Sequence, residues 1–295
     1  MSNLKEIRTR IGSVKSTRQI TSAMKMVSAA KLKKTQDAVI HLRPYAYKLH
    51  SILRDLSKSL EGNQQNQYTR QEGEGRILLV PISSNKGLCG AFNANINKET
   101  NRIISEIYYD SLDTSKLQLY PIGKNAYEFA IAKGLPVIKY NNDIQEELNF
   151  AKAAPIAEEL IQWFLDQKFD EIILIYNKFK NAAVQIITTE NLLPVSMDTE
   201  ELDDQSYPPD YIFEPSQDYI IKNLIPKSLK IQFYDALLES LTAEHGARMT
   251  AMHKATDNAT SLLKELRLTY NKARQAAITN EILEIVSGAE ALNKR

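Results

Sequence analysis

The sequence is poor in the features that mark several common protein classes. It has one cysteine among 295 residues, so neither an intrachain disulfide nor a multi-cysteine metal site can form. No apolar run approaches the roughly 20 residues that a membrane-spanning helix needs. The first residues are polar and charged, unlike a secretory signal peptide. Hydrophobic content of 43% excludes wholesale disorder, so we expect a folded chain, soluble or peripheral to a membrane, in a reducing compartment.

The near-neutral net charge of +1 hides an uneven distribution of charge. The first 60 residues carry 13 Lys or Arg against 3 Asp or Glu, a charge of +10, so the other 235 sum to about −9. Such a basic segment favours an acidic partner, which could be nucleic acid, anionic lipid or an acidic protein surface. No aromatic residue precedes Tyr45, and stacking on nucleic-acid bases requires aromatic rings. We therefore do not expect a nucleic-acid partner.

Composition and periodicity divide the chain into five stretches. They are a long N-terminal helix at 1–61, a polar linker at 62–75, a central α/β domain at 76–197, an acidic, proline-rich linker or loop at 198–215, and a long C-terminal helix at 216–295. From the last proline onward, about 65 helical residues would span roughly 95 Å at 1.5 Å each. A compact chain of this length would measure only about 50 Å, so the helix cannot be buried inside its own molecule.

Both terminal stretches carry helix-type periodicity. In the C-terminal stretch nine residues follow unbroken 3-4 spacing: Met249, Met252, Thr256, Ala259, Leu263, Leu266, Tyr270, Ala273 and Ala277. In the N-terminal stretch apolar residues recur at helical spacing before residue 15 and again after residue 38. Between these two parts we expect the helix face to be built from Ala23, Met24, Met26, Val27, Ala29 and Ala30. The pattern predicts a long antiparallel coiled coil of the two ends. Pro44 predicts a bend or an interruption, and Pro226 predicts an early interruption with a separate short helix at 217–224.

The middle of the chain alternates between strand and helix patterns. We expect strands at 76–82, 117–122, 136–140, 171–176 and 184–189, and helices at 93–109, 124–133 and 151–167. This alternation predicts a mainly parallel, doubly wound α/β domain with a Rossmann-like fold.

The motifs of catalysis are missing. The turn Ser83–Asn93 (SSNKGLCGAFN) follows a strand and precedes a helix but lacks the glycine spacing that wraps phosphates, so we expect a structural turn. Cys89 has no histidine nearby in sequence and is expected to be a packed residue rather than a nucleophile. His41, His50, His245 and His253 show no zinc-binding pattern, so we expect no metal site, no cofactor and no catalytic residue.

Two terminal motifs resemble a known family. The opening stretch at 7–38 (IRTRIGSVKSTRQITSAMKMVSAAKLKKTQDA) and the closing stretch at 270–292 (YNKARQAAITNEILEIVSGAEAL) are similar to the γ subunits of bacterial F-type ATP synthases. KGLCGAFN and the DYIFEP stretch at 210–215 resemble landmarks of the family's middle domain.

The resemblance implies a role without chemistry of its own. Such a subunit is the central rotor shaft, present once per complex, and it mechanically couples proton-driven rotation of the c ring to ATP synthesis or hydrolysis on the β subunits. It implies partners in the α, β, ε and c-ring subunits, with peripheral attachment at the cytoplasmic face of the bacterial inner membrane.

The resemblance also implies which residues meet these partners. For the ring of three α and three β subunits they are Arg8, Arg10, Met24, Lys25, Lys31, Arg274, Gln275 and Thr279, and for a foot against ε and the c ring they are Tyr211 and Glu214. Lys25 departs from relatives that carry an acid there, and the single cysteine excludes the paired-cysteine switch of some members.

Two other classes fit parts of the pattern. A coiled-coil scaffold unrelated to ATP synthesis would show the same heptads but would not need the terminal motifs. A free-standing α/β enzyme would need an acid-base or nucleophile constellation at its strand ends, and the sequence shows none.

Overall fold

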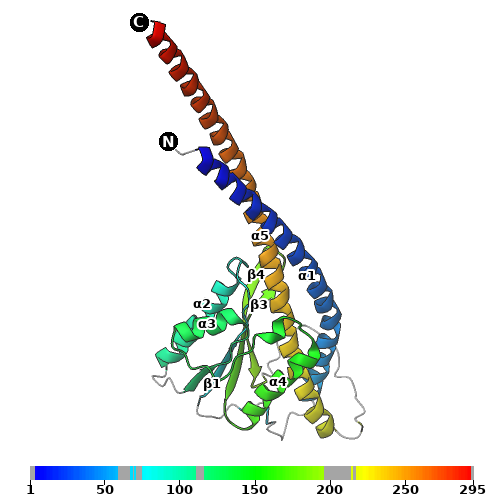
Figure 1. Cartoon of the computed structure of the whole chain (residues 1–295). Coiled ribbons are helices and arrows are strands. Elements are labelled where there is room, and N and C mark those ends of the chain that lie inside the picture. Colours follow the sequence, from blue (N-terminus) through cyan, green and yellow to red (C-terminus); the bar gives the residue numbers. More distant parts are fainter. Residues whose placement is uncertain are drawn as a thin grey trace. The chain divides into compact units, whose positions relative to one another are not determined.

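The computed structural model describes residues 4–58, 67–68, 70, 75–110, 116–195, 214 and 217–293 (Figure 1). These residues form two compact units, which we describe separately. The helical unit is made of Met1–Ser28 and Met249–Arg295, and the central unit is Ala29–Arg248. The predicted linker at 62–75 and the predicted loop at 198–215 lie mostly outside the described residues.

Two long helices contribute to both units. Helix α1 is Leu4–Lys58 and helix α5 is Gln217–Asn293, and each is continuous through its proline. The predicted interruption at Pro226 and the separate helix at 217–224 are therefore wrong, and at Pro44 an interruption, one of the two predicted outcomes, does not occur. A proline inside a helix costs about 3 kcal/mol through a lost hydrogen bond and steric conflict. Buried residues on both sides, such as Val39 and Leu49 around Pro44, offset this local cost.

The helical unit is a two-helix pair. All nine residues of the predicted C-terminal heptad are buried or half-buried, which confirms that pattern. Thr21 hydrogen-bonds to Thr256 at 2.9 Å, and Lys25 lies 3.4 Å from His253. Residue numbers therefore rise along one helix as they fall along the other, so the two helices run antiparallel.

The predicted small-residue face of α1 is turned inward only in part, because Met24 and Ala29 are half-buried while its other members are exposed. Arg18, Thr21, Lys25 and Ser28 are buried or half-buried as well, and they continue the 3-4 spacing with polar side chains. Met26 and Val27 are 65% and 58% exposed, and Ala23 and Ala30 are exposed as well. Apolar content alone missed the polar residues that are turned inward here.

The central unit is built on a four-stranded sheet of order β2-β1-β3-β4. Strand β1 (Ile77–Pro81) pairs in parallel with β2 (Leu117–Leu119) and with β3 (Glu171–Phe179), while β4 (Gln185–Leu193) is antiparallel to β3. The fifth predicted strand, at 136–140, does not form within the described range 116–195. Val137 and Asn141 make only isolated bridges there, to Leu119 and Ile122.

Helices cover both faces of this sheet. Helices α2 (Phe92–Asp110) and α3 (Lys124–Ala132) pack with Leu79 on one face. Helix α4 (Phe150–Leu165), the 3₁₀ turn η2 (Asp143–Gln145) and part of α5 pack with Leu78 and Val80 on the other. This arrangement confirms the α/β class. Among the described residues, no helix is long and apolar enough to cross a bilayer.

Candidate coupling surfaces

The turn at 83–93 has the geometry of a structural connection. Its backbone carbonyls at Lys86 and Gly87 accept hydrogen bonds from the Arg248 guanidinium, so they face a cation of the same chain. Cys89 is 2% exposed and accepts from the Asn93 amide at 3.3 Å. The turn is thus occupied by internal contacts, as expected for a packed cysteine and a non-phosphate loop.

The histidines do not form a metal site within the described residues. No group of three or more His, Cys, Asp and Glu side chains comes together there. His245 is buried, and its burial, with the positive charges of Arg248 and Lys31, lowers its pKa to about 4. It is therefore neutral at physiological pH. His253 is exposed, 3.4 Å from both Lys25 and Asp257.

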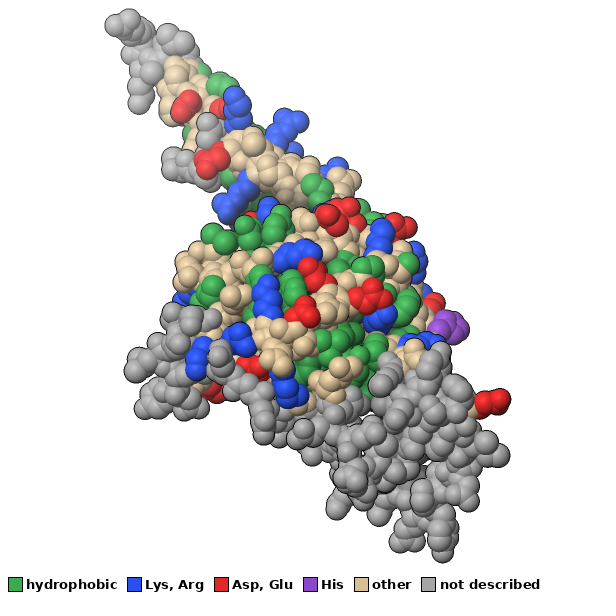
Figure 2. Space-filling model, turned by 90° about the horizontal axis from the view of Figure 1, so that it is seen from below, with side chains coloured by type: hydrophobic (Ala, Val, Ile, Leu, Met, Phe, Trp, Pro, Cys, Tyr) green, Lys and Arg blue, Asp and Glu red, His purple; other side chains and the backbone are tan. Residues whose placement is uncertain are grey.

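Surface charge on the central unit is mixed in the view of Figure 2. Lys and Arg side chains alternate with Asp and Glu over the face that is seen there, and apolar patches lie between them. A nucleic-acid surface would instead concentrate positive charge on one face. This face offers no support for such a partner.

The end of α5 exposes large apolar side chains. Between Ile278 and Val286 five of them are 46% to 71% exposed: Ile278, Ile282, Leu283, Ile285 and Val286. A monomeric soluble protein rarely exposes a continuous apolar strip, and such strips mark interaction surfaces. Sequence reasoning missed this strip, although its signal was present: the heptad seam stops at Ala277 while apolar residues continue.

Comparison with known proteins decides the family. The ATP synthase family model matches residues 3–292. An ATP synthase gamma chain of Flavobacterium johnsoniae is 55% identical over 294 residues, covering 99% of this chain and 100% of that one. That of Christiangramia forsetii is 53% identical over 293 residues, with coverage of 99% and 100%. The chain belongs to the ATP synthase gamma-chain family.

Solved structures agree with this family. The central stalk and c ring of the Tetrahymena thermophila mitochondrial ATP synthase includes a chain with 27% identity and a TM-score of 0.57, covering 80% of this chain and 99% of that one. A chain of the Euglena gracilis mitochondrial ATP synthase in rotational state 3 has a TM-score of 0.69 at 23% identity, with coverage of 98% and 94%, and supports the fold. As a gamma chain, the protein is the central rotor stalk and a non-catalytic subunit of an F-type ATP synthase.

The structure places the predicted contact residues of this rotor stalk as follows. Exposed positions are held by Arg8, Arg10, Lys31, Arg274, Gln275 and Thr279, and half-buried positions by Met24 and Lys25. The Thr279 hydroxyl donates to the backbone of Gln275 one turn earlier. Glu214 is exposed, and Tyr211 lies outside the described residues.

A partly buried acidic cluster was not predicted at all. Asp235 and Glu239 of α5 lie near Glu190 of β4. The Glu190 carboxylate accepts from Tyr176 and Gln232, both at 2.6 Å. Burial, together with the charges of Glu239 and Glu190, raises the pKa of Asp235 to about 6. Residues of β3, β4 and α5 contribute to this cluster, so no spacing within one segment of the sequence could have predicted it.

Proposed function

We propose that the chain turns inside a ring of three α and three β subunits and links ATP synthesis there to proton-driven rotation of a c ring. One copy would serve each complex. The observation that carries this proposal is the exposed apolar end of α5, from Ile278 to Val286, which needs a surrounding surface. A largely apolar bearing has no deep electrostatic minimum at any one angle, so it resists rotation little.

Charged and polar residues would supply the specific contacts with the ring. We assign this role to Arg8, Arg10, Met24, Lys25, Lys31, Arg274, Gln275 and Thr279. Six of these are exposed, and the N-terminal members belong to the basic first 60 residues, which suits acidic loops on the β subunits. Lys25 is the most constrained of them, because its ammonium already lies 3.4 Å from His253.

The opposite contact would be with the membrane sector. We assign Tyr211 and Glu214 to a foot that touches ε and the c-ring loops. Through these subunits the chain would be held peripherally at the cytoplasmic face of the bacterial inner membrane. The similar Tetrahymena assembly joins a central stalk to a c ring, which supports this part of the proposal.

The mechanism is a shift of populations at the ring's nucleotide sites. A rotor that is not threefold symmetric makes different contacts with each β subunit. Each site is then biased toward a different binding state, and rotation exchanges these states in turn. The chain needs no catalytic group for this role, only a stiff connection between its two ends.

Co-purification from membranes tests the proposal. A tagged chain, extracted gently, should carry α, β, ε and c subunits and an ATP hydrolysis activity. In that particle Arg274→Ala should lower ATP-driven proton pumping more than hydrolysis, with exposed Lys133→Ala as the control. Recovery of the chain alone, or with unrelated proteins, would refute the assignment.

A further inference from the structure

Residues 239–248 of α5, which we call the anchor segment, are tied by polar groups to four other parts of the central unit. These parts are α1, the end of β3, the residue after β1 and the turn at 86–87. Elsewhere in the described central-unit part of α5 such polar ties are fewer, namely Lys230 with Glu158 of α4 and Gln232 with Glu190 of β4. The concentration of directional contacts within ten residues sets this segment apart.

Glu239 fixes one end of the anchor segment. One oxygen of its carboxylate accepts from the Arg43 guanidinium of α1 at 2.9 Å, and the other accepts from the backbone N–H of Phe179 at 3.0 Å. The Glu239 side chain is 3% exposed. A buried carboxylate with two donors from different elements cannot rotate away without losing one of them, which is costly in a low-dielectric site.

Arg248 fixes the other end. Its guanidinium pairs with Glu244 at 2.6 Å and donates at 2.8 Å to the carbonyl of Lys86, with a longer bond to Gly87. Side-chain exposures of 11% and 9% show that the pair is buried. The planar guanidinium holds the loop and the helix together in a fixed orientation, because its donors point in set directions.

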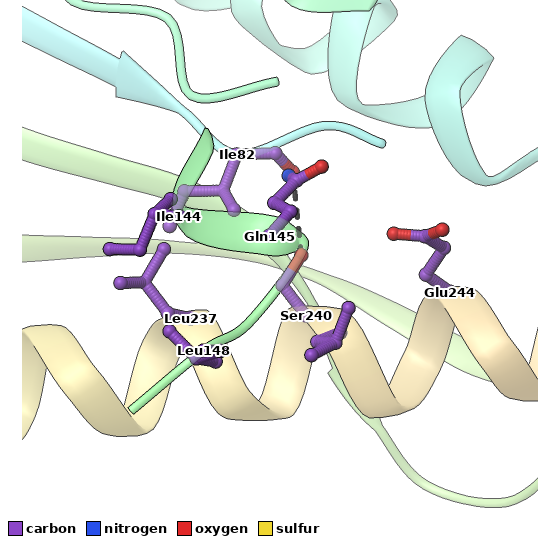
Figure 3. A pocket seen from close by; sticks show the side chains of 8 residues that line it. Ile82, Ile144, Gln145, Leu148, Leu237, Ser240 and Glu244 are labelled. Atoms are coloured by element: carbon purple, nitrogen blue, oxygen red, sulfur yellow. Dashed lines mark hydrogen bonds between the residues drawn. The ribbon is translucent and has the colours of Figure 1, made fainter. Parts of the chain in front are cut away.

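Between these two ends the helix lies very close to the β3–β4 turn. A Cβ on Gly246 would meet a ring carbon of Phe179 at 3.2 Å and the Cα of Ala182 at 3.3 Å. Figure 3 shows Ser240 and Leu237 directed from α5 toward Ile82 and Ile144, and the Ser240 hydroxyl donates to the Ile82 carbonyl. The cavity among them is only about 10 Å³, room for about one water, so the contact is tight.

These contacts matter because apolar packing and hydrogen bonds resist different motions. Burial of apolar surface is non-directional and allows a helix to turn slightly in its groove. Hydrogen bonds weaken steeply when their angle changes, so bonds from both ends of a ten-residue segment oppose twisting about the helix axis. A rotor needs that resistance where a long helix is attached to its domain.

We propose that residues 239–248 form a torsional anchor, in which Glu239 and Arg248 are positioning residues that let torque on the central unit enter α5 without slip. The proposal rests on the rotor function proposed above. It assigns to these side chains a mechanical role that is separate from any contact with the ring.

The test measures torsional stiffness in the assembled particle. The ring is fixed to a surface, and a gold rod is attached to the central unit through Lys133→Cys, an exposed position; the native Cys89 is buried and will not compete. Angular fluctuations are recorded during catalytic pauses. Arg248→Lys keeps the charge beside Glu244 but not the fork that reaches two carbonyls, and we expect it to raise the angular variance about twofold, with unloaded ATP hydrolysis unchanged.

A matched control separates the anchor from ordinary ion pairing. Arg102→Lys makes the same change in a guanidinium whose ion-pair partners among the described residues, Glu99 and Glu106, both lie in α2, and it should leave the variance unchanged. Glu239→Gln is the second anchor variant, and it decides the question alone if Arg248→Lys does not assemble. Wild-type variance in assembled anchor variants would overturn the proposal. A wild-type particle that does not rotate would instead refute the rotor function.

Discussion

The two units hold the same helix in opposite ways. In the central unit, nearly every described side chain of α5 from Ile225 to Arg248 is buried or half-buried, against a sheet, three helices and several turns. In the helical unit α5 touches one partner helix along a narrow seam, and from Ile278 to Ala289 every side chain is exposed. One helix is thus anchored on most sides over about a third of its length, packed along one seam over the next part, and exposed near its end. That difference is what a shaft needs, because one part must transmit force and the other must turn against a neighbour.

The largest expected effect concerns the open part. Separated from its complex, the chain should aggregate, because the apolar strip after Ala277 has no cover. The triple change Ile282→Ser, Leu283→Ser and Ile285→Ser should keep it monomeric, as measured by light scattering over a concentration series. As a control, Ile282→Val, Leu283→Ile and Ile285→Val keep the strip apolar and should still aggregate. A wild-type chain that stays monomeric would show that the strip needs no partner.

Truncation of a core side chain should lower the free energy of unfolding more in the central unit than in the helical unit. In the soluble triple-serine background, Phe233→Ala in the central unit should cost about 4 kcal/mol, because its ring is fully buried. Leu263→Ala in the helical unit should cost about 2 kcal/mol, since a two-helix seam can partly close over the gap. Urea denaturation measures both. Equal losses would mean that the seam is packed as rigidly as the sheet core.

The sequence predicted the α5 side of the seam but not the polar positions on the α1 side, and the reason is physical. On α5 its members are mostly apolar, so the 3-4 spacing revealed them. On α1 the same spacing passes through Arg18, Thr21 and Lys25, and a hydrophobicity pattern assigns such residues to the surface. Both prolines misled for a related reason: the local cost of about 3 kcal/mol is visible in the sequence, but the tertiary packing that outweighs it is not.

The candidate contact residues could be predicted from the sequence, whereas the anchor segment could not. Terminal motifs pointed to Arg8 or Arg274 because those motifs are contiguous in the chain. The anchor joins Arg43, Phe179 and Glu239, separated by up to 196 residues, and no spacing rule connects them. Only the sheet order and the path of α5 bring them together. Sequence therefore predicted the elements of this rotor and the ends of its shaft, but not how the shaft is fixed.

The acidic cluster of the central unit predicts a pH dependence that the helical unit should lack. The pKa of Asp235 is raised to about 6 in the folded state, above its unfolded value. The folded state therefore binds this proton more tightly, and the contribution of Asp235 to stability falls as pH rises from about 4 to about 6.5. The lowered pKa of His245 contributes a rise over the same range, so the Asp235 contribution is read from the difference between variant and wild type. Asp235→Asn should remove this fall and stabilise the chain at pH 7 by about 2 kcal/mol. Its control is Asp257→Asn, an exposed acid of the helical unit, which should keep the wild-type profile in urea denaturation across pH 4 to 7.

The smallest expected effect sharpens the comparison within the helical unit. The Thr256 hydroxyl donates across the seam to the Thr21 hydroxyl at 2.9 Å, and the Thr21 hydroxyl donates to the carbonyl of Arg18 in its own helix. Thr256→Val alone leaves the inward Thr21 oxygen without its donor and should cost about 1 kcal/mol. Changing both to Val removes donor and acceptor together and keeps the shape, so the double variant should lie within about 0.5 kcal/mol of the original chain. A double-mutant cycle in urea measures the difference. Additive losses would mean that the two hydroxyls act independently. Recovery in the double variant would show that this polar pair contributes little stability and that the helical unit is held together mainly by its apolar positions.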